Sequence, residues 1–298
     1  MKIKSTSVDD TFAEAFKMYA ARLIITADTR QWALSAATSM TGFATSVIGC
    51  KCEAGIEAEI APEDTPDRRP GVSVLVFAMD AAGLGKRLVE RVGQCVMTCP
   101  TTACFDGLEG DESVVVGGQL RYFGDGHQVS KKLGTRRHWR IPVMDGEFLV
   151  DERITVQQAV GGGNIILLGK DSKTTLRAAN AATKAMRNIR GVILPFPDGV
   201  VRSGSKVGSR YKSLMASTNE KFCPSLRGLD VKSELDEGVN CVLEIVIDGL
   251  DENAVKDAMQ AGMLAAAKPG IKRISAGNYG GNLGQYNIQL HPLLGGAA

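Results

Sequence analysis

The residue best suited to chemistry is Glu244, in the middle of an apolar segment, 240–249, that reads NCVLEIVIDG. If this segment forms a strand, its side chains alternate between two faces, and Glu244 shares a face with Val242 and Val246. Burying an ionised carboxylate among valines costs several kcal/mol unless it is paired, so its pKa rises or it acquires a partner. Such a carboxyl suits proton transfer, or hydrogen-bond donation to a developing charge, near neutral pH. A glutamate on a solvated sheet face or in a structural ion pair would show the same pattern.

A second candidate is the loop 195–208, PFPDGVVRSGSKVG, which combines small residues with positive charge. The basic residues in and just after it are Arg202, Lys206, Arg210 and Lys212. These cations could hold carboxylates or a phosphate of a long substrate, while the small residues let a ligand approach the backbone. The pattern GxxxxGK[ST] is absent, so nucleotide hydrolysis through a P-loop has no support. A solvated basic turn is the alternative.

Hydroxyl and amide donors occur in two further runs, ASTNEKFCP at 216–224 and ISAGNYGGNLGQY at 274–286. The second run contains Ser275 and the adjacent Asn278 and Tyr279, which are flanked by glycines. Ordinary turn chemistry explains both runs as well as a binding site does.

Other kinds of site have weak support. No serine lies in a GxSxG elbow, and the three histidines lie in turn-rich or terminal surroundings, which disfavours a nucleophilic triad. A Cys–His pair stays open. The spacings of Cys50 and Cys52, and of Cys95, Cys99 and Cys104, do not match the CxxC knuckle of a zinc site. The run GGGN at 161–164 does not match the GxGxxG pattern of a dinucleotide-binding fold.

The composition is that of an ordinary globular protein of more than one lobe. The 298 residues are 44% hydrophobic and 23% charged, with a net charge of +2, which gives no case for nucleic-acid or membrane attraction. No apolar run is long enough to span a membrane, and residues 1–4 do not begin a signal peptide. Seven cysteines without a secretion signal favour reduced thiols in the cytoplasm.

The elements that must position these residues follow one order twice. The first half predicts a helix start at 9–14, a strand at 21–26, a helix at 28–41, an extended segment at 43–48, a strand at 72–79, a helix at 82–92 and a strand at 94–97. The second half predicts a strand at 165–168, a helix at 171–190, an extended segment at 191–194, a strand at 242–247, a helix at 252–267 and a strand at 271–275. Each half therefore reads β-α-β-β-α-β, the split-βαβ or ferredoxin-like arrangement.

The two halves also align in sequence. SVLVFAMD at 73–80 lies over CVLEIVID at 241–248, so Val76 takes the place of Glu244 and suggests that this sheet position is usually buried. We therefore predict an α+β fold of two duplicated ferredoxin-like lobes with antiparallel sheets, residues 1–148 and 149–298.

Residues 105–148 do not fit the repeat, so we predict that they form an inserted β arm. A strand is expected at 114–123, a turn-rich basic stretch at 124–140, and extended segments at 141–143 and 147–150. Such an excursion packs against a neighbouring subunit or is an ornamental hairpin.

Long segments of the chain resemble the formylmethanofuran–tetrahydromethanopterin formyltransferase family. The segments are DTFAEAF (10–16), TGFATSVIGCKCEAGI (41–56), TPDRRPGV (65–72), GQCVMTCPT (93–101), YFGDG (122–126), PFPDGVVRSGSKVGS (195–209), ASTNEKFCP (216–224), CVLEIVIDGL (241–250) and ISAGNYGGNLGQY (274–286). The resemblance covers nearly the whole chain. It implies two ferredoxin-like lobes and a cytoplasmic enzyme that moves a formyl group between the amine of methanofuran and N5 of tetrahydromethanopterin. It implies no bound cofactor or metal, with methanofuran and tetrahydromethanopterin as substrates, and assembly into a dimer or tetramer.

The resemblance also implies site residues. The family's catalytic carboxylate falls on Glu244, where a neutral carboxyl could hydrogen-bond the tetrahedral oxyanion or transfer a proton. The substrate-binding residues that lie in the matching segments are Gln94, Phe123, Arg202, Ser205, Lys206, Ser217, Asn219, Asn278 and Tyr279.

The slightly basic composition departs from the acidic character of members from salt-rich thermophilic methanogens. It favours a mesophilic host, such as a methylotrophic bacterium, where the family member is the transferase subunit of a formyltransferase/hydrolase complex. The alternative is a non-catalytic ligand-binding or assembly subunit of such a complex.

Overall fold

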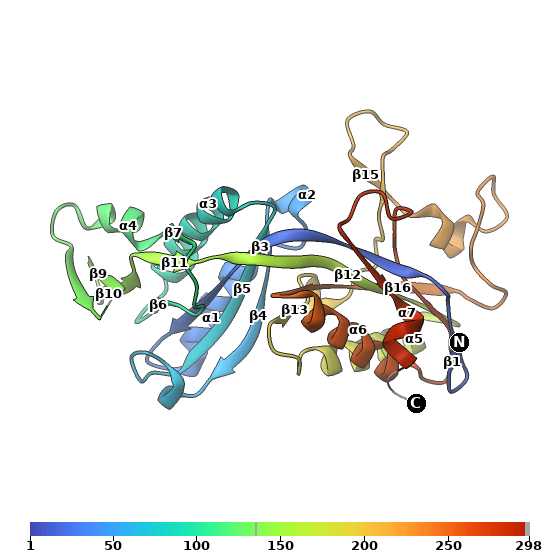
Figure 1. Ribbon diagram of the computed structural model, residues 1–298, viewed down its shortest axis with the longest axis horizontal. Coiled ribbons are helices and arrows are strands. Elements are labelled where there is room, and N and C mark those ends of the chain that lie inside the picture. Colours follow the sequence, from blue (N-terminus) through green and yellow to red (C-terminus); the bar gives the residue numbers. More distant parts are fainter. Residues whose placement is uncertain (135, 296–298) are drawn as a thin grey trace. The chain divides into compact units, whose positions relative to one another are not determined.

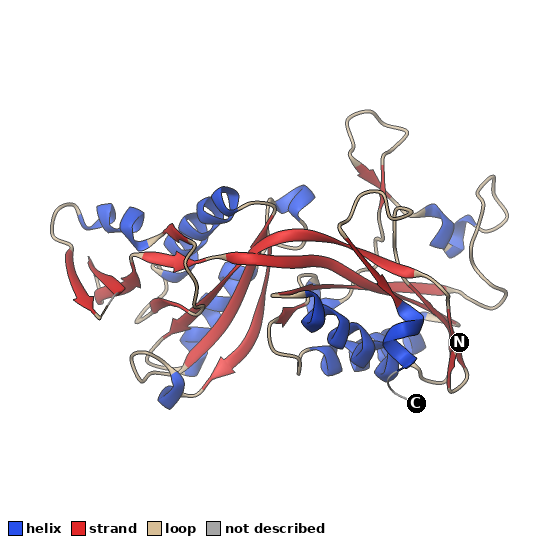
Figure 2. Ribbon diagram, in the orientation of Figure 1, coloured by secondary structure: helices blue, strands red, loops and turns tan. Residues whose placement is uncertain are grey.

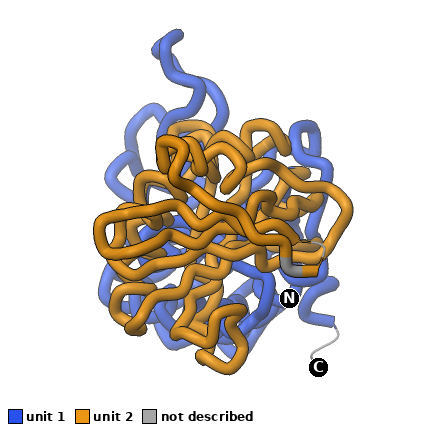
Figure 3. The backbone as a smooth tube through the Cα atoms, turned by 90° about the vertical axis from the view of Figure 1, so that its left-hand side faces the viewer, with its two compact units in different colours: residues 1–16, 161–248, 252–298 blue, residues 17–160, 249–251 orange. Residues whose placement is uncertain are grey.

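The structure, a computed structural model, describes residues 1–134 and 136–295 and consists of two compact units (Figures 1 and 3). One unit comprises Met1–Phe16, Gly161–Asp248 and Glu252–Ala298, and the other comprises Lys17–Val160 and Gly249–Asp251. We call them the Glu244 unit and the arm unit. The chain passes between them inside two long strands, β3 (Phe12–Thr26) and β12 (Gln157–Gly169). Helices and mostly antiparallel strands occur in both units (Figure 2), which confirms the predicted α+β class.

The arm unit is built around β3, which pairs antiparallel with β5 and β6. Its first elements are α1 (Arg30–Thr41), α2 (Val47–Cys50), β4 (Glu53–Ile60), η1 (Pro62–Asp64), β5 (Gly71–Ala78), α3 (Ala81–Arg91), η2 (Val92–Val96) and β6 (Ala103–Asp106). The strand order is β4–β5–β3–β6. Every residue of β5 is buried, as expected for a continuous apolar run at the centre of a sheet. Helix α3 begins where the Asp80 carboxylate accepts the Gly83 N–H at 2.7 Å.

The predicted arm extends this sheet. Its elements are β7 (Ser113–Val115), α4 (Gly117–Leu120), η3 (Arg121–Gly124), β8 (Val129–Leu133), β9 (Arg136–Val143), β10 (Gly146–Asp151) and β11 (Arg153–Thr155). Strands β8, β9 and β10 form an antiparallel meander, and β10 pairs with β6 in parallel. A separate pair, β11 with β7, closes the segment.

The Glu244 unit contains helices and strands from both ends of the chain. They are β1 (Lys2–Ile3), β2 (Thr6–Val8), α5 (Ser172–Met186), β13 (Val192–Ile193), β16 (Cys241–Gly249), α6 (Glu252–Ala266), β17 (Ile271–Ser275), β18 (Tyr286–Gln289) and α7 (Leu290–Gly295). The strand order is β2–β17–β12–β16–β13, and β18 pairs with the start of β3. Helices α5 and α6 touch at Gly262, where an added Cβ would lie 1.9 Å from the Met186 Cε. The small residue therefore lets the two helices approach closely.

A long loop region separates β13 from β16. It contains η4 (Pro197–Gly199), the two-stranded hairpin of β14 (Lys206–Val207) and β15 (Ala216–Ser217), η5 (Glu220–Phe222) and η6 (Pro224–Leu226). In Figure 1 the hairpin projects from the unit as a separate finger.

Three local predictions within the first 100 residues are wrong. The helix start at 9–14 is instead the beginning of β3, because residues 12–15 pair with residues 286–289, far away in sequence. The extended segment at 43–48 gives way to the short helix α2, whose cap Ser46 accepts the Ile48 N–H, and the strand begins only at Glu53. The strand at 94–97 is the π-helix η2, which continues α3 without a break.

The strand predicted at 114–123 is also wrong beyond Val115. A Cβ on Gly117 would lie 2.4 Å from the Asp151 backbone oxygen, so the chain turns there into α4, in a space that admits no side chain. The stretch 124–140, predicted as turn-rich, contains β8 and most of β9. Thr135 in that stretch, and residues 296–298 of the predicted second lobe, lie outside the described residues.

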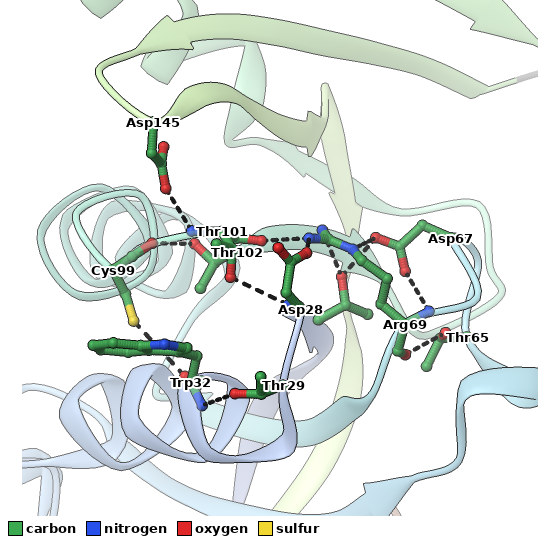
Figure 4. A network of polar contacts seen from close by, with 11 residues as sticks. Asp28, Thr29, Trp32, Thr65, Asp67, Arg69, Cys99, Thr101, Thr102 and Asp145 are labelled. Carbon is green, nitrogen blue, oxygen red and sulfur yellow. Dashed lines mark hydrogen bonds and ion pairs between the residues drawn. The ribbon is translucent and has the colours of Figure 1, made fainter.

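A network around Arg69 fixes the loops of the arm unit (Figure 4). The guanidinium binds the Asp28 and Asp67 carboxylates, each at 2.9 Å, and donates to the Thr101 carbonyl. Next to it, the Thr102 hydroxyl donates to the Val96 carbonyl at 2.6 Å. The network therefore ties the end of β3 to the turn that follows η2.

Candidate functional site

The backbone of Glu244 is fixed on both sides. Its strand, β16, pairs with β12 and β13. Beyond β13, Val201 forms an isolated bridge with Glu244, with N–H···O distances of 2.8 and 3.0 Å. Arg202, one of the predicted binding residues, directly follows Val201 in the chain. The basic loop therefore meets β16 at the residue that carries the carboxyl.

The Glu244 carboxyl is desolvated and unpaired. The residue keeps only partial contact with solvent, and burial raises the pKa of the carboxyl from 4.5 to about 7. Within residues 1–134 and 136–295, no hydrogen bond or ion pair to this carboxyl is found. A carboxyl with a pKa near neutrality can hold or release a proton at small cost, as acid–base catalysis requires. The burial predicted from the strand pattern is therefore present, while the catalytic role stays a prediction.

Tyr279 is a predicted site residue that lies within electrostatic range of Glu244. Burial, then the negative charges of Glu244 and Glu14, raise the pKa of its phenol. The ring also contacts Phe16, with 6.3 Å between the ring centroids. The hydroxyl is therefore a neutral hydrogen-bond donor at physiological pH.

Glu14, on β3, organises the loop that carries Tyr279. Only 1% of the residue is exposed, and its carboxylate accepts four backbone N–H groups. Burial alone would raise the pKa of Glu14, but the bonds from Gly284, Tyr279, Leu283 and Gly281 outweigh it and lower the pKa. Sequence reasoning missed this residue, because the local pattern places Glu14 in a helix start. Its place between the buried Ala13 and Ala15 was the available signal.

Asn278 anchors the same loop. Its amide nitrogen donates to the Thr11 hydroxyl and to the Phe12 carbonyl, each at 3.1 Å, and its amide oxygen accepts the Gly280 N–H. Both ends of the amide are therefore engaged within the protein, which is the geometry of a structural residue rather than of a free ligand donor.

The other predicted residues of this unit lie in the region of the β14–β15 hairpin. Lys206 forms an ion pair with Glu220, and the Ser217 hydroxyl donates to the Gly208 carbonyl at 2.7 Å. Asn219 is partly buried at the start of η5. Arg202 and Ser205 are exposed, and in the described part of the chain Arg202 has no ion-pair partner. Arg202 is therefore better placed than Lys206 to bind an external anion.

Two predicted residues belong to the arm unit. Gln94 is exposed on the π-helix η2, and Phe123 is 67% exposed in η3. Single π-helical turns inside helices occur frequently at functional sites, which supports Gln94 as a candidate. The structure gives neither residue a relation to Glu244.

No group of three or more His, Cys, Asp or Glu side chains among the described residues is arranged to hold a metal ion. None of the described helices is both long enough and apolar enough to cross a membrane.

An α+β protein with a desolvated, unpaired carboxyl within electrostatic range of a buried phenol has the groups that an acid–base transferase needs. Residues 1–143 match the family model described as formylmethanofuran-tetrahydromethanopterin formyltransferase, and residues 146–293 match its proximal lobe. The chain therefore belongs to the formylmethanofuran–tetrahydromethanopterin formyltransferase family, which confirms the resemblance found in the sequence.

Relatives match over nearly their whole length. The formyltransferase of Methylococcus capsulatus is 55% identical, covering 99% of this chain and 100% of the relative. The solved formyltransferase of Methanosarcina barkeri is 48% identical with a TM-score of 0.93, covering 98% of this chain and 100% of that chain. A solved formyltransferase/hydrolase complex from Methylorubrum extorquens, in complex with methylofuran, contains a chain 51% identical with a TM-score of 0.96, covering 99% of this chain and 98% of that chain.

Proposed function

We propose that the protein transfers a formyl group, reversibly, between formylmethanofuran and N5 of tetrahydromethanopterin. The observation that carries the proposal is the unpaired Glu244 carboxyl, whose pKa is about 7, in a chain that matches formyltransferases from end to end. The two C1 carriers are substrates rather than bound cofactors. The chemistry needs one proton removed and one proton added, which a group with such a pKa can do in turn.

The reaction balances with Glu244 as the only proton carrier. The N5 lone pair attacks the formyl carbon, a C–N5 bond forms, and the carbonyl π electrons move to oxygen to give a tetrahedral oxyanion. A neutral Glu244 hydrogen-bonds the oxyanion and then protonates the methanofuran nitrogen. The oxyanion then reforms the carbonyl, the old C–N bond breaks, and the proton lost by N5 replaces the one donated.

We propose that the substrates are held by the residues found in the family segments. They are Gln94, Phe123, Arg202, Ser205, Lys206, Ser217, Asn219 and Tyr279, whereas Asn278, whose amide is engaged within the protein, supports the loop that carries Tyr279. Arg202 is our first choice for an anionic extension of a substrate, because it is exposed and adjoins Val201. Lys206 would have to exchange its Glu220 partner for the substrate.

The competing function is that of a non-catalytic subunit, because a relative from Methylorubrum extorquens is named as one of the subunits of a formyltransferase/hydrolase complex. The purified chain alone, supplied with formylmethanofuran and tetrahydromethanopterin, separates the two functions. Formation of formyl-tetrahydromethanopterin, lost in Glu244→Gln, supports the enzyme. If the wild-type chain is inactive alone but restores activity to the other subunits even as Glu244→Gln, the assembly role is correct.

We propose that the halves 1–148 and 149–298 are duplicated ferredoxin-like lobes. Two sheet orders support this, β6–β3–β5–β4 in the arm unit and β17–β12–β16–β13 in the Glu244 unit. In both, the fourth, first, third and second strands of a β-α-β-β-α-β series lie side by side. An experimental structure in which the two sets of elements fail to superpose would refute the duplication.

We propose a homo-oligomer, a dimer or tetramer, in the cytoplasm. Large apolar side chains lie exposed on the arm, among them Tyr122, Phe123 and Met144, and such a surface favours contact with a second copy. All seven cysteines are free thiols, which fits a reducing compartment. Analytical ultracentrifugation at micromolar concentration tests the assembly, and a monomer would contradict it.

A further inference from the structure

The loop that carries Tyr279 is wrapped around a single buried carboxylate. Glu14 Oε2 accepts the N–H groups of Tyr279 and Gly281 at 2.6 and 2.9 Å. Glu14 Oε1 accepts those of Leu283 and Gly284, each at 2.6 Å. Four donors converge on an acceptor-only group, so the loop conformation requires the ionised form of this side chain.

The glycines of the loop are adapted to this arrangement. Gly280 and Gly281 have φ angles of +74° and +75°, which side chains rarely adopt. A Cβ on Gly284 would lie 2.5 Å from the Ala15 carbonyl oxygen and 2.7 Å from the Glu14 Cγ. The closure of the loop around the carboxylate therefore favours glycine at these three positions.

Tyr279 connects the anchor to the candidate site. Its N–H is one of the four donors to Glu14, its ring packs on Phe16, and its phenol lies within electrostatic range of Glu244. The Glu14 carboxylate has all its partners inside the protein, so it has no free position for a substrate.

We propose that Glu14 is a positioning residue for formyl transfer, which fixes the loop 279–284 and with it the Tyr279 side chain that packs on Phe16. The inference rests on the proposed function. Glu14 acts through Tyr279 and does not touch the reacting atoms. Gln at this position presents an amide that would donate toward backbone donors, so the loop must move.

A double-mutant cycle tests this role, with wild type, Glu14→Gln, Tyr279→Phe and the double variant. We expect Glu14→Gln to lower kcat on the order of 10- to 100-fold, as a misplaced group near the chemistry does. In the Tyr279→Phe background the same change should cost much less, because the group that it positions is already absent. Glu14→Asp, which keeps the charge, should recover part of the loss. Equal losses in both backgrounds would overturn the proposal.

Two further measurements separate positioning from damage to the fold. Glu57→Gln, which weakens a different ion pair, with Arg22, should lower stability while leaving the shape of the pH–rate profile unchanged. Spectrophotometric titration, with Tyr279→Phe subtracted, should show a lower pKa for Tyr279 in Glu14→Gln, because the Glu14 charge that raises it is gone. An unchanged Tyr279 pKa, or a similar kinetic loss in Glu57→Gln, would contradict the role. A wild-type protein without formyl transfer would refute the proposed function itself, whereas an active wild type with additive losses would refute only the part assigned to Glu14.

Discussion

Val201 and Glu244 exchange two backbone hydrogen bonds, at 2.8 and 3.0 Å, across the edge of the Glu244 unit's sheet. This bridge brings the start of the basic loop to the strand that carries the proposed catalytic carboxyl. A carboxyl on a strand that is paired on both sides is held more rigidly than one on a loop, so it needs little reorganisation when the reaction begins.

Glu244→Gln should keep the fold but lower kcat by about 10²–10³-fold, the usual cost of removing a donor to an oxyanion. A steady-state assay with both substrates measures the effect, with circular dichroism as the check on folding. Glu252→Gln, which alters only a half-exposed pair with Lys256 on α6, is the matched control and should stay near wild type. Wild-type turnover in Glu244→Gln would end the assignment.

The stability of the protein should depend on the ionisation of Glu244. Because burial raises the folded-state pKa of this carboxyl from 4.5 to about 7, the native protein retains a proton that the unfolded chain loses over this interval. The free energy of unfolding therefore falls as pH rises from about 4.5 to about 7, and the loss persists at higher pH. In Glu244→Gln this contribution is absent. Scanning calorimetry should therefore show that the Tm of Glu244→Gln, relative to the Tm of wild type, rises between about pH 5 and about pH 8. A flat difference for Glu244→Gln would show that the carboxyl is not desolvated.

Arg202→Ala should raise the KM for one substrate on the order of 10-fold with little change in kcat, because a cation remote from the reacting carbon binds ground state and transition state equally. Initial-rate kinetics with each substrate varied in turn measures this. The opposite pattern, a lower kcat at constant KM, would count against a binding role.

Charge reversal at Lys206 should also raise a KM more than it lowers kcat. Lys206→Glu places a like charge beside Glu220, so the β14–β15 hairpin is expected to loosen as well. The double swap Lys206→Glu with Glu220→Lys restores the ion pair and separates the two effects. If the swap recovers the KM, Lys206 acts through the hairpin rather than on the substrate.

Arg69→Met should destabilise the protein by on the order of 2 kcal/mol, because the hydrogen bonds to Asp28, Asp67 and the Thr101 carbonyl are lost together. Urea unfolding, followed by fluorescence, measures the change. Arg68→Met, which loses only a surface bond to the Glu63 carbonyl, should cost far less. Equal losses in the two variants would show that the network contributes little.

Short-range patterns predicted part of this structure well. The burial of Glu244 was suggested by its alignment with Val76 in the apolar segment 73–80, because side-chain alternation alone fits a solvated sheet face as well. The helices α5 and α6 followed from local periodicity and the cap at Asp171. In the second half the predicted helices and strands occur in the predicted order, whereas in the first half the elements expected at 9–14, 43–48 and 94–97 are of another type.

What the sequence could not reveal depends on residues far apart in the chain. The four donors to Glu14 lie 265 to 270 positions away, so the residues around Glu14 do not indicate what its carboxylate binds. Residues 94–97 have the composition of a strand, yet the helix before them continues, because tertiary packing overrides weak propensity. Lys206 resembled a free cation, and only the fold shows that Glu220 already neutralises it.

Each unit is built from segments that are far apart in the sequence, so a fragment that covers one half of the chain lacks part of its unit. A fragment that begins at residue 149 would contain Glu244 and Tyr279 but would lack the first segment of β3, and with it Glu14 and the strand partner of β18. The 279–284 loop would then have no carboxylate to fold around. In a fragment-complementation experiment, the 279–284 loop should therefore regain its conformation only when the added peptide includes residues 12–16. This first segment of β3 is then required to complete the proposed site.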